Sequence, residues 1–164
     1  MNSIFQRTSV REFGCRPVEE EKLEQILRSA MQAPSAGNQQ PWEFYVVRDS
    51  AKIQQLSQTS PYAGCAKNAT VCLVPCYRKE GLRHAAYADI DMSACCENIL
   101  IEAVELGLGA VWLGIAPLQE RMEAVAQVLQ LPDSLAAFAI LPLGYPLIKA
   151  EPKERYEAKR IHWL

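Results

Sequence analysis

The sequence has little of what a metal site or a disulfide framework needs. Its 164 residues include only two histidines, His84 and His162, and six cysteines without a C-x-x-C pair. The usual spacing of a structural zinc site is therefore missing, and we predict no metal centre. The adjacent Cys95 and Cys96 fall in a helical stretch, a poor geometry for a bond between them. We expect most cysteines to be reduced, buried and used as small hydrophobic side chains.

Long apolar runs and an excess of positive charge are also missing. No run approaches the ~20 apolar residues that span a bilayer, and residues 1–11 lack the apolar core of a signal peptide. The formal net charge of −2 argues against nucleic acid or an anionic membrane as the main partner. We therefore expect a cytoplasmic protein that binds neither. The length predicts one domain over residues 1–164.

Helical and extended patterns alternate along the chain. The spacing of apolar residues predicts helices over 2–8, from Pro17 to just before Pro34, and over 51–58, 87–107 and 118–129. Aromatic and β-branched runs predict strands over 43–47, 69–76, 110–115 and 136–143. Pro75 is expected to place the end of the second strand at a sheet edge. The helix over 87–107 is apolar around most of its circumference, which predicts both a central position and contact with a second subunit.

Residues 33–42, between the first long helix and the first strand, form the most unusual stretch. They hold two prolines, a glycine, a serine, an asparagine, two glutamines and a closing tryptophan, where a plain connection needs only a few residues. A fixed backbone with many neutral polar groups can present N–H and C=O groups to a ligand at little ordering cost. The alternative is a turn rich in Asn, Gly and Pro beside a buried tryptophan.

Charged and hydroxyl side chains gather near both ends of the chain. In an extended segment Arg7, Ser9 and Arg11 would share one face. Such a cluster suits a phosphate or a polyhydroxylated ligand, and the alternative is a solvated basic edge paired with nearby acids. The charged tail over 149–160 has the composition of a solvated segment. Because residues 161–164 are apolar, we expect the tail to dock, with a partner subunit as one candidate surface.

Two glycine motifs follow the helix over 87–107. Gly107-Leu108-Gly109 comes after a helix and before a strand, the reverse of the order in a dinucleotide fingerprint, so we reject a Rossmann fold. Gly114 stands at the end of the predicted strand over 110–115. A glycine in that position lets a flat ligand approach the backbone closely.

Four motifs in this order resemble the nitroreductase family of flavin enzymes, and the resemblance covers essentially the whole chain. The motifs are Arg7-Thr8-Ser9-Val10-Arg11, similar to the family's Arg-Arg-Ser-x-Arg; residues 34–42, similar to its Pro-Ser-x-x-Asn-x-Gln-Pro-Trp; residues 107–114; and Lys153-Glu154-Arg155. The resemblance implies an α+β sandwich with a mainly antiparallel central sheet flanked by helices. It also implies an intimate homodimer with two FMN molecules at the subunit interface.

The resemblance further implies which residues would bind FMN. These are Arg7, Thr8, Ser9 and Arg11 for the phosphate, ribityl chain and one pyrimidine edge; Lys153 and Arg155 of the same subunit for the phosphate; Pro34, Ser35, Ala36 and Asn38 of the other subunit for ring cover; and Leu113 and Gly114 near the reactive N5 edge. Thr8 stands where the family often has a second arginine, which predicts a weaker contact there. Positive groups near the pyrimidine would stabilise an anionic reduced flavin.

Chemistry carried by FMN needs no catalytic side chain, and we predict none. The resemblance implies an NAD(P)H oxidoreductase with a ping-pong cycle: a hydride from NADH or NADPH reaches flavin N5, and a nitroaromatic, a quinone or a free flavin then occupies the same face. The chain lacks the long insertion of larger members before residue 110, so the substrate side should be open. Tyr62 and His84 are the candidates for side chains near the substrate.

Three alternatives remain open from the sequence. The first is another flavin reaction of the same family, such as dehalogenation, enone reduction or flavin fragmentation, although these usually rely on lid residues that this short chain lacks. The second is a non-catalytic FMN-binding protein, which would hold flavin without being reduced by NAD(P)H. The third is a dimeric scaffold without a cofactor.

Overall fold

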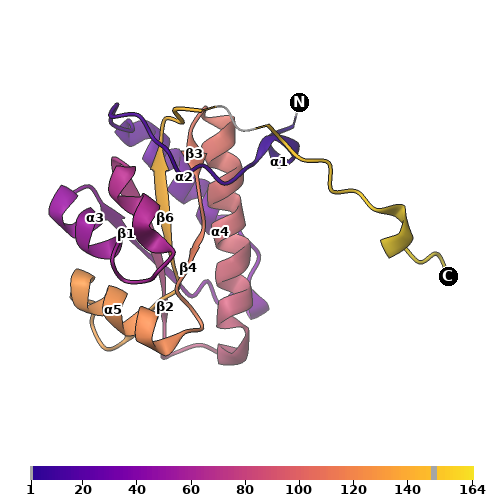
Figure 1. Ribbon diagram of the computed structural model, residues 1–164. Coiled ribbons are helices and arrows are strands. Elements are labelled where there is room, and N and C mark those ends of the chain that lie inside the picture. The colour runs from indigo at the N-terminus through magenta and orange to yellow at the C-terminus, as the bar shows by residue number, and fades with distance from the viewer. Residues whose placement is uncertain (1, 149–150) are drawn as a thin grey trace.

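An antiparallel sheet forms the middle layer of the protein in the computed structural model, which describes residues 2–148 and 151–164 (Figure 1). The strands are β1 (Trp42–Val47), β2 (Val71–Arg78), β3 (Gly109–Ala110), β4 (Leu113–Gly114), β5 (Leu135–Ala137) and β6 (Ala139–Gly144). Their order is β1-β2-β6-β3, with β4 paired to β6 and β5 paired to β2. Every one of these pairs is antiparallel, as predicted.

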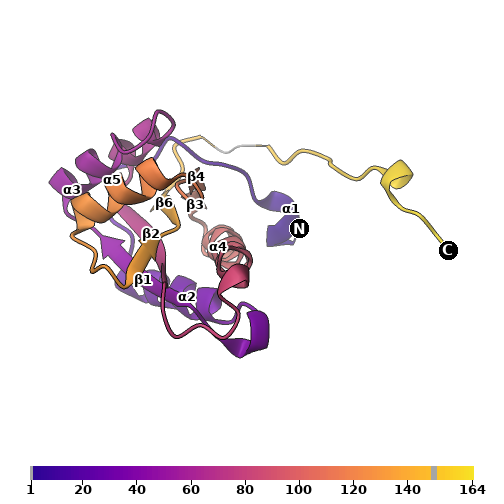
Figure 2. The ribbon, with the colours of Figure 1, turned by 90° about the horizontal axis from the view of Figure 1, so that it is seen from below.

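Helices cover both faces of this sheet (Figure 2). They are α1 (Ser3–Gln6), α2 (Glu20–Met31), α3 (Ser50–Leu56), α4 (Ala88–Glu105) and α5 (Gln119–Leu129), with short 3₁₀ helices η1 (Ala36–Asn38), η2 (Ala63–Asn68), η3 (Ala85–Tyr87) and η4 (Ala158–Arg160). Alternate residues of β2 enter the two cores: Leu73 packs with α2 and α4, whereas Cys72 and Val74 pack with α3 and α5. This period of two confirms the predicted α+β sandwich.

Pro75 lies inside β2, where the sequence predicted the end of a strand at an edge. That prediction was wrong, because β2 continues to Arg78 and lies between β1 and the pair β5 and β6. The Pro75 carbonyl accepts a hydrogen bond from the Phe138 N–H at 2.9 Å, and the Phe138 carbonyl accepts one from Ala116 at 2.9 Å. The N–H group that proline lacks would point to the break between β5 and β6, so an interior strand tolerates Pro75.

Three other boundaries differ from the predictions. The helix predicted from Pro17 begins at Glu20, because Glu19 is still extended and caps the helix. The strand predicted over 110–115 is divided into β3 and β4, and the strand over 136–143 is divided at Phe138 into β5 and β6. β3 and β4 both pair with β6 and are separated by residues 111–112, whereas β5 and β6 both pair with β2 and differ by one residue in register across Phe138. A run of apolar residues reveals neither interruption.

Helix α4 is the central helix that its apolar composition predicted. Met92, Cys95 and Ile99 are fully buried against α2 and the sheet. The helix is terminated by Gly107, which follows the C-cap residue Leu106 and has a φ of +73°, with hydrogen bonds from Gly107 N to Val104 O and from Leu108 N to Ala103 O. These two bonds form a Schellman motif, which needs a left-handed residue at that position.

A polar stripe on α4 faces other elements of the protein. Asp91 accepts a hydrogen bond from the loop before β1, and Asn98 donates one to the Ser29 carbonyl of α2. Glu102 accepts from Gln25 of α2, and Glu105 accepts from Ser3 of α1. The face of α4 that bears Ile90, by contrast, is open, and Ile90 keeps 62% of its surface exposed.

The tail extends away from the rest of the protein (Figures 1 and 2). Residues 149 and 150, the first two of the predicted tail, lie outside the described residues. The hydrogen bonds and ion pairs of residues 151–164 all stay within that segment, and Trp163 keeps 90% of its surface exposed. The tail therefore makes no hydrogen bond or ion pair to the described part of the body, and its docking on a partner subunit remains a prediction.

Candidate functional site

The segment over residues 7–11 lies beside β3. Ser9 forms a parallel bridge with Ala110, and the Val10 N–H donates to the Ala110 carbonyl at 2.9 Å. A Cβ atom at Gly109 would come within 2.7 Å of the Val10 side chain, so this close approach needs glycine. The structure thus brings the first motif into contact with the third, over residues 107–114.

The two arginines of this segment have different surroundings. Arg7 Nε lies 3.5 Å from Glu97 Oε1 of α4, and the Arg7 side chain is 22% exposed. Arg11 is exposed and lies close enough to Cys65 to affect it: burial raises the pKa of the Cys65 thiol, and the positive charge of Arg11 partly offsets this rise. Thr8 is half-buried and Ser9 exposed. Guanidinium and hydroxyl groups therefore line an accessible edge next to β3.

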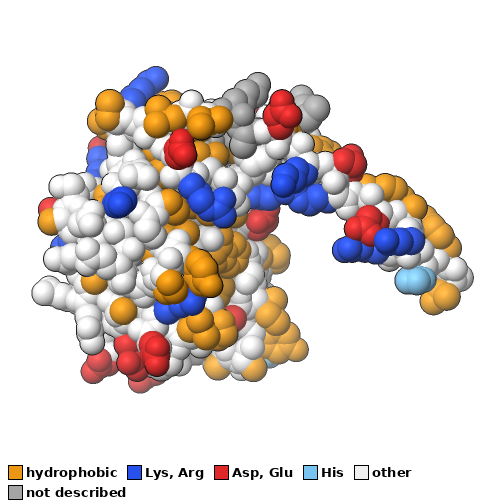
Figure 3. Space-filling model, viewed as in Figure 1, with side chains coloured by type: hydrophobic (Ala, Val, Ile, Leu, Met, Phe, Trp, Pro, Cys, Tyr) orange, Lys and Arg blue, Asp and Glu red, His pale blue; other side chains and the backbone are white. Residues whose placement is uncertain are grey.

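The tail cations Lys153 and Arg155 lie beside α1. A hollow of about 800 Å³ is lined by Ile4 and Phe5 of α1 and by residues 152–156. Within the tail, Arg155 donates to the Lys153 carbonyl at 3.1 Å. Lys and Arg side chains gather where the tail leaves the body (Figure 3). Because α1 ends next to Arg7, the tail adds the positive charges of Lys153 and Arg155 near the segment over residues 7–11.

The loop over residues 33–42 is held by the buried carboxylate of Asp91. Asp91 is 4% exposed and accepts hydrogen bonds from Ala36 N at 2.9 Å and from Gln39 Nε2 at 2.7 Å. The Ser35 hydroxyl accepts from Gln40 N at 3.0 Å. At the end of the loop Trp42 is 8% exposed and packs in the core. The loop thus has the fixed backbone that its composition predicted.

Left-handed backbone conformations complete the shape of this loop. Gly37, Asn38 and Gln40 have φ values of 57°, 54° and 45°. A Cβ atom at Gly37 would lie 2.9 Å from the His84 ring, and His84 N donates to Gln39 Oε1 at 2.9 Å. His84 therefore packs against the loop. Pro34 and Asn38 are exposed, whereas Ser35 and Ala36 are half-buried.

Gly114 presents an unobstructed backbone at the end of β4. A Cβ atom added there would have no other atom within 4 Å, and Gly114 is exposed while its neighbour Leu113 is buried. Arg121 of α5 donates from Nη1 to the Gly114 carbonyl at 3.0 Å. The Arg121 guanidinium also lies 5.5 Å from the centre of the Tyr62 ring. Tyr62, predicted near the substrate, is thus close to the predicted N5 contact, whereas His84 packs against the loop over 33–42.

The sequence patterns did not indicate Arg121 as a site residue. It belongs to an amphipathic helix, where an arginine between apolar positions is typical of a solvated face. Its position depends on the turn between β4 and α5, and no spacing rule connects Gly114 with a side chain seven residues later. An arginine in the first turn of a helix after a predicted ligand-binding glycine was the one signal available.

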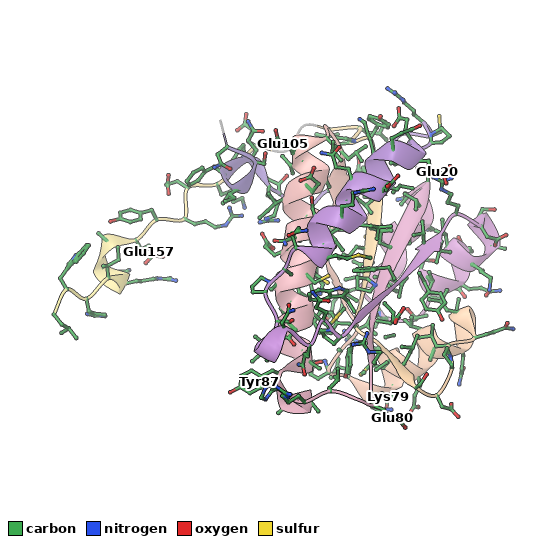
Figure 4. The ribbon with its side chains drawn as sticks, turned by 180° about the vertical axis from the view of Figure 1, so that it is seen from behind. Glu20, Lys79, Glu80, Tyr87, Glu105 and Glu157 are labelled. Carbon is green, nitrogen blue, oxygen red and sulfur yellow. The ribbon has the colours of Figure 1, made fainter. Side chains whose placement is uncertain are left out.

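The loop and the N-terminal segment are not brought together within one chain. The loop is bound to Asp91 near the start of α4, whereas α1 is bound to Glu105 at its end. Figure 4 shows Tyr87 and Glu105 at opposite ends of this helix. At a rise of about 1.5 Å per residue, the two attachment points are separated by roughly 20 Å. Each chain therefore carries the two halves of the predicted site at opposite ends of α4.

The cysteines take no part in this arrangement. All six are free, and Cys72, Cys76, Cys95 and Cys96 are buried, as expected for small hydrophobic side chains. Burial raises the pKa of Cys72, Cys76 and Cys95 to about 12, so these thiols stay protonated at neutral pH. Among the described residues, no group of three or more His, Cys, Asp or Glu side chains is placed to hold a metal ion.

A membrane-spanning segment is not found among the described residues, since none of their helices has both the necessary length and apolar character.

Comparisons with known proteins give a consistent result. The model of the Nitroreductase family matches residues 4–62 and 60–145. A relative from Archaeoglobus fulgidus, provisionally named NADH dehydrogenase/NAD(P)H nitroreductase, is 37% identical over 166 residues, which cover 99% of this chain and 95% of that protein. A crystal structure of a provisionally named NADH oxidase from Clostridium acetobutylicum superposes with a TM-score of 0.95, at 42% identity and 98% coverage of both chains.

One further similar structure contains a cofactor. It is a provisionally named nitroreductase from Desulfovibrio desulfuricans in complex with FMN, with a TM-score of 0.83 and 28% identity, covering 97% of this chain and 92% of that chain.

Proposed function

The chain belongs to the nitroreductase family, and from this premise we propose that it is an FMN-dependent NAD(P)H oxidoreductase. When bound, FMN supplies a two-electron carrier that takes a hydride from NADH or NADPH and passes two electrons to an acceptor. With a quinone, NAD(P)H and one proton yield NAD(P)⁺ and the hydroquinone. The observation that carries the proposal is the contact between the segment over 7–11 and β3, which places cations, hydroxyls and an open backbone on one edge of the sheet.

The donor set at this edge fits the chemistry of FMN. A phosphate dianion favours guanidinium groups and hydroxyls, which Arg7, Ser9 and Arg11 provide, with Thr8 beside them. Lys153 and Arg155 would add charge from the tail of the same subunit. A flat ring system needs backbone that no side chain covers, and Gly114 provides it next to Leu113. Support comes also from the similar structure that contains FMN and from the relative whose name includes NAD(P)H.

The two separated halves of the site support a homodimer. A two-fold axis that packs α4 against its copy in antiparallel orientation places the start of one helix beside the end of the other. The loop residues Pro34, Ser35, Ala36 and Asn38 of one subunit would then cover the flavin held by the segment over 7–11 of its partner. Such a dimer contains two equivalent sites.

Exposed apolar side chains on this side of the molecule support the same dimer. Phe5 is 68% exposed on α1, next to the open face of α4 that bears Ile90. Figure 3 shows hydrophobic side chains along the side of the body that bears α4 and along the tail. Apolar patches of this kind mark interaction surfaces. A partner subunit would also cover Tyr156 and Trp163 of the tail.

The test of this function is the visible spectrum of the freshly purified protein, followed by NADH and NADPH without oxygen. We expect flavin bands that bleach with at least one donor. Bands that persist with both donors would favour a non-catalytic FMN-binding protein. If no bands appear even after reconstitution with FMN, the cofactor assignment is wrong and a scaffold without a cofactor remains.

A further inference from the structure

Arg121 connects three features of the open side of the candidate site. It donates a hydrogen bond to the Gly114 carbonyl at 3.0 Å, and its guanidinium lies 5.5 Å from the centre of the Tyr62 ring. It also lines a hollow of about 750 Å³ between the start of α5 and the residues before Tyr62. The hollow therefore begins next to the backbone at which the flavin N5 edge is proposed to lie.

The charge of Arg121 has no acidic partner among residues 2–148 and 151–164. Arginines elsewhere in the chain form ion pairs, such as Arg7 with Glu97 and Arg28 with Glu24. Glu123, two residues further along α5 and so not facing Arg121, accepts a hydrogen bond from Gln119 at 2.8 Å. A guanidinium has five N–H donors, and one of those of Arg121 is used by Gly114. Charge and donors thus remain available to a ligand.

Glu120 is the acidic group whose negative charge opposes the positive charge of Arg121 in the hollow. It lines the same hollow as Arg121 but is exposed to solvent, where water and salt screen its charge. Arg121 is half-buried, so its field toward the hollow is less screened. The cation–π contact with Tyr62 and the bond to Gly114 also help to hold the guanidinium in place, which reduces the entropy lost when it binds an anion.

We propose that Arg121 is a specificity-determining residue, which recognises an anionic group on the molecule that enters the open face beside Gly114. This inference rests on the proposed function, because it assigns that face to the electron donor and acceptor. The anionic group belongs either to the acceptor, as a carboxylate or sulfonate on a nitroaromatic or quinone, or to the diphosphate of NAD(P)H. Both are recognised by the same guanidinium chemistry.

The first arm of the test measures binding without turnover. 4-Nitrobenzoate and its neutral isostere 4-nitrobenzamide are titrated into the oxidised protein in the absence of NAD(P)H, by calorimetry. Arg121→Gln, which keeps an amide donor for Gly114, should raise the dissociation constant of 4-nitrobenzoate about fivefold and leave that of 4-nitrobenzamide unchanged, the size expected for a partly exposed ion pair. Arg121→Lys should retain most of the binding, and 0.5 M salt should reduce the difference.

Arg28→Gln is the matched control, because it removes the same charge from α2 on the other face of the sheet. It should leave both dissociation constants unchanged. Equal losses for the two ligands in Arg121→Gln would show that the residue only holds Gly114 in position. Equal losses would overturn the proposal, and so would no loss for either ligand combined with an unchanged rate of flavin bleaching by NADH.

The second arm identifies the source of the anion from anaerobic bleaching rates of the flavin. A slower rate in Arg121→Gln with NADH, but not with the neutral N-benzyl-1,4-dihydronicotinamide, would assign the anion to the donor. Equal effects on the two donors, together with a binding loss confined to 4-nitrobenzoate, would assign it to the acceptor. A wild-type protein that neither donor reduces would refute the proposed function, whereas the binding comparison tests Arg121 independently.

Discussion

The two halves of the candidate site are built in different ways. The loop over 33–42 is fixed before any ligand arrives, because a buried carboxylate, several short-range hydrogen bonds and left-handed residues determine its backbone. The segment over 7–11 is attached through its backbone to β3, while Ser9 and Arg11 remain exposed. The loop is thus suited to shape a flat cover, and the segment to be stabilised by the anion that it is proposed to bind.

This difference predicts opposite effects of mutation in the two halves. Changes in the segment should weaken ligand binding and spare the fold. Changes at the anchor of the loop should cost folding stability whether or not a ligand is present. The following predictions are ordered from the largest expected effect to the smallest.

The double variant Arg7→Ala/Arg11→Ala tests the ligand-dependent half. Each charged contact contributes roughly 1.5–3 kcal/mol, so FMN binding should weaken by about 3–6 kcal/mol, measured as the dissociation constant by fluorescence titration. The midpoint of urea unfolding of the flavin-free protein should change little. The control Arg28→Ala/Arg48→Ala removes the same charge elsewhere. If the first pair retains its flavin through dialysis, the phosphate assignment is wrong.

Asp91→Ala tests the pre-formed half. The substitution leaves the Ala36 N–H and the Gln39 amide without their acceptor, and each buried unsatisfied donor costs about 1–3 kcal/mol. We expect the free energy of unfolding of the flavin-free protein to fall by about 2–4 kcal/mol, measured with urea. The exposed Asp133→Ala serves as the control. A variant as stable as the wild type would mean that Asp91 does not hold the loop.

Tyr145→Phe tests the hydrogen bond that anchors Glu19, which follows the segment over 7–11 in the chain. The Tyr145 hydroxyl donates to Glu19 Oε2 at 2.6 Å, and this bond, together with a backbone bond and Arg16, lowers the pKa of Glu19 from 4.5 to about 2. Since the folded pKa is lower than the unfolded one, the carboxylate stabilises the fold above pH 4.5 and loses this effect as the pH falls to about 2.

The stability difference between wild type and Tyr145→Phe should therefore be small, should be present at its full size at pH 7, and should vanish near pH 2. Melting temperatures across this range measure it, and the exposed Tyr156→Phe provides the control. A difference that does not depend on pH would show that the Tyr145 hydroxyl acts through the hydrogen bond that it accepts from Lys22 Nζ at 3.1 Å, and not through Glu19.

Much of the architecture could be predicted from residues whose role is local. The apolar circumference of 87–107 predicted the central α4, and the composition of 33–42 predicted a fixed loop closed by a buried tryptophan. The position of Pro75 could not be predicted in this way, because its tolerance depends on a break between two strands that follow it by more than 50 residues. The division of the predicted strand over 136–143 could not be predicted either, since it reflects a one-residue shift in register against β2.

For the site, the sequence identified residue types better than their assembly. It predicted that Arg7, Ser9 and Arg11 share an exposed edge, and that Gly114 is open to a ligand. The hydrogen bond between Arg121 and Gly114 depends on the angle between a strand and the next helix, which no pattern of residues encodes. The separation of the loop from the segment by the length of α4 likewise becomes visible only when the fold is known.

The central claim is that each flavin is held by the segment of one subunit and the loop of the other. Its most direct test is co-expression of two variants that are each unable to bind FMN: Arg7→Ala/Arg11→Ala, which lacks the cations, and Pro34→Trp, which places a bulky ring where the partner's flavin would lie. In a mixed dimer, the intact segment of the second chain meets the intact loop of the first. We predict that purified mixtures recover about a quarter of the wild-type FMN content, because about half of the dimers are mixed and each contains one complete site. Mixtures without FMN would contradict the shared site, since a site built within one chain is defective in both variants.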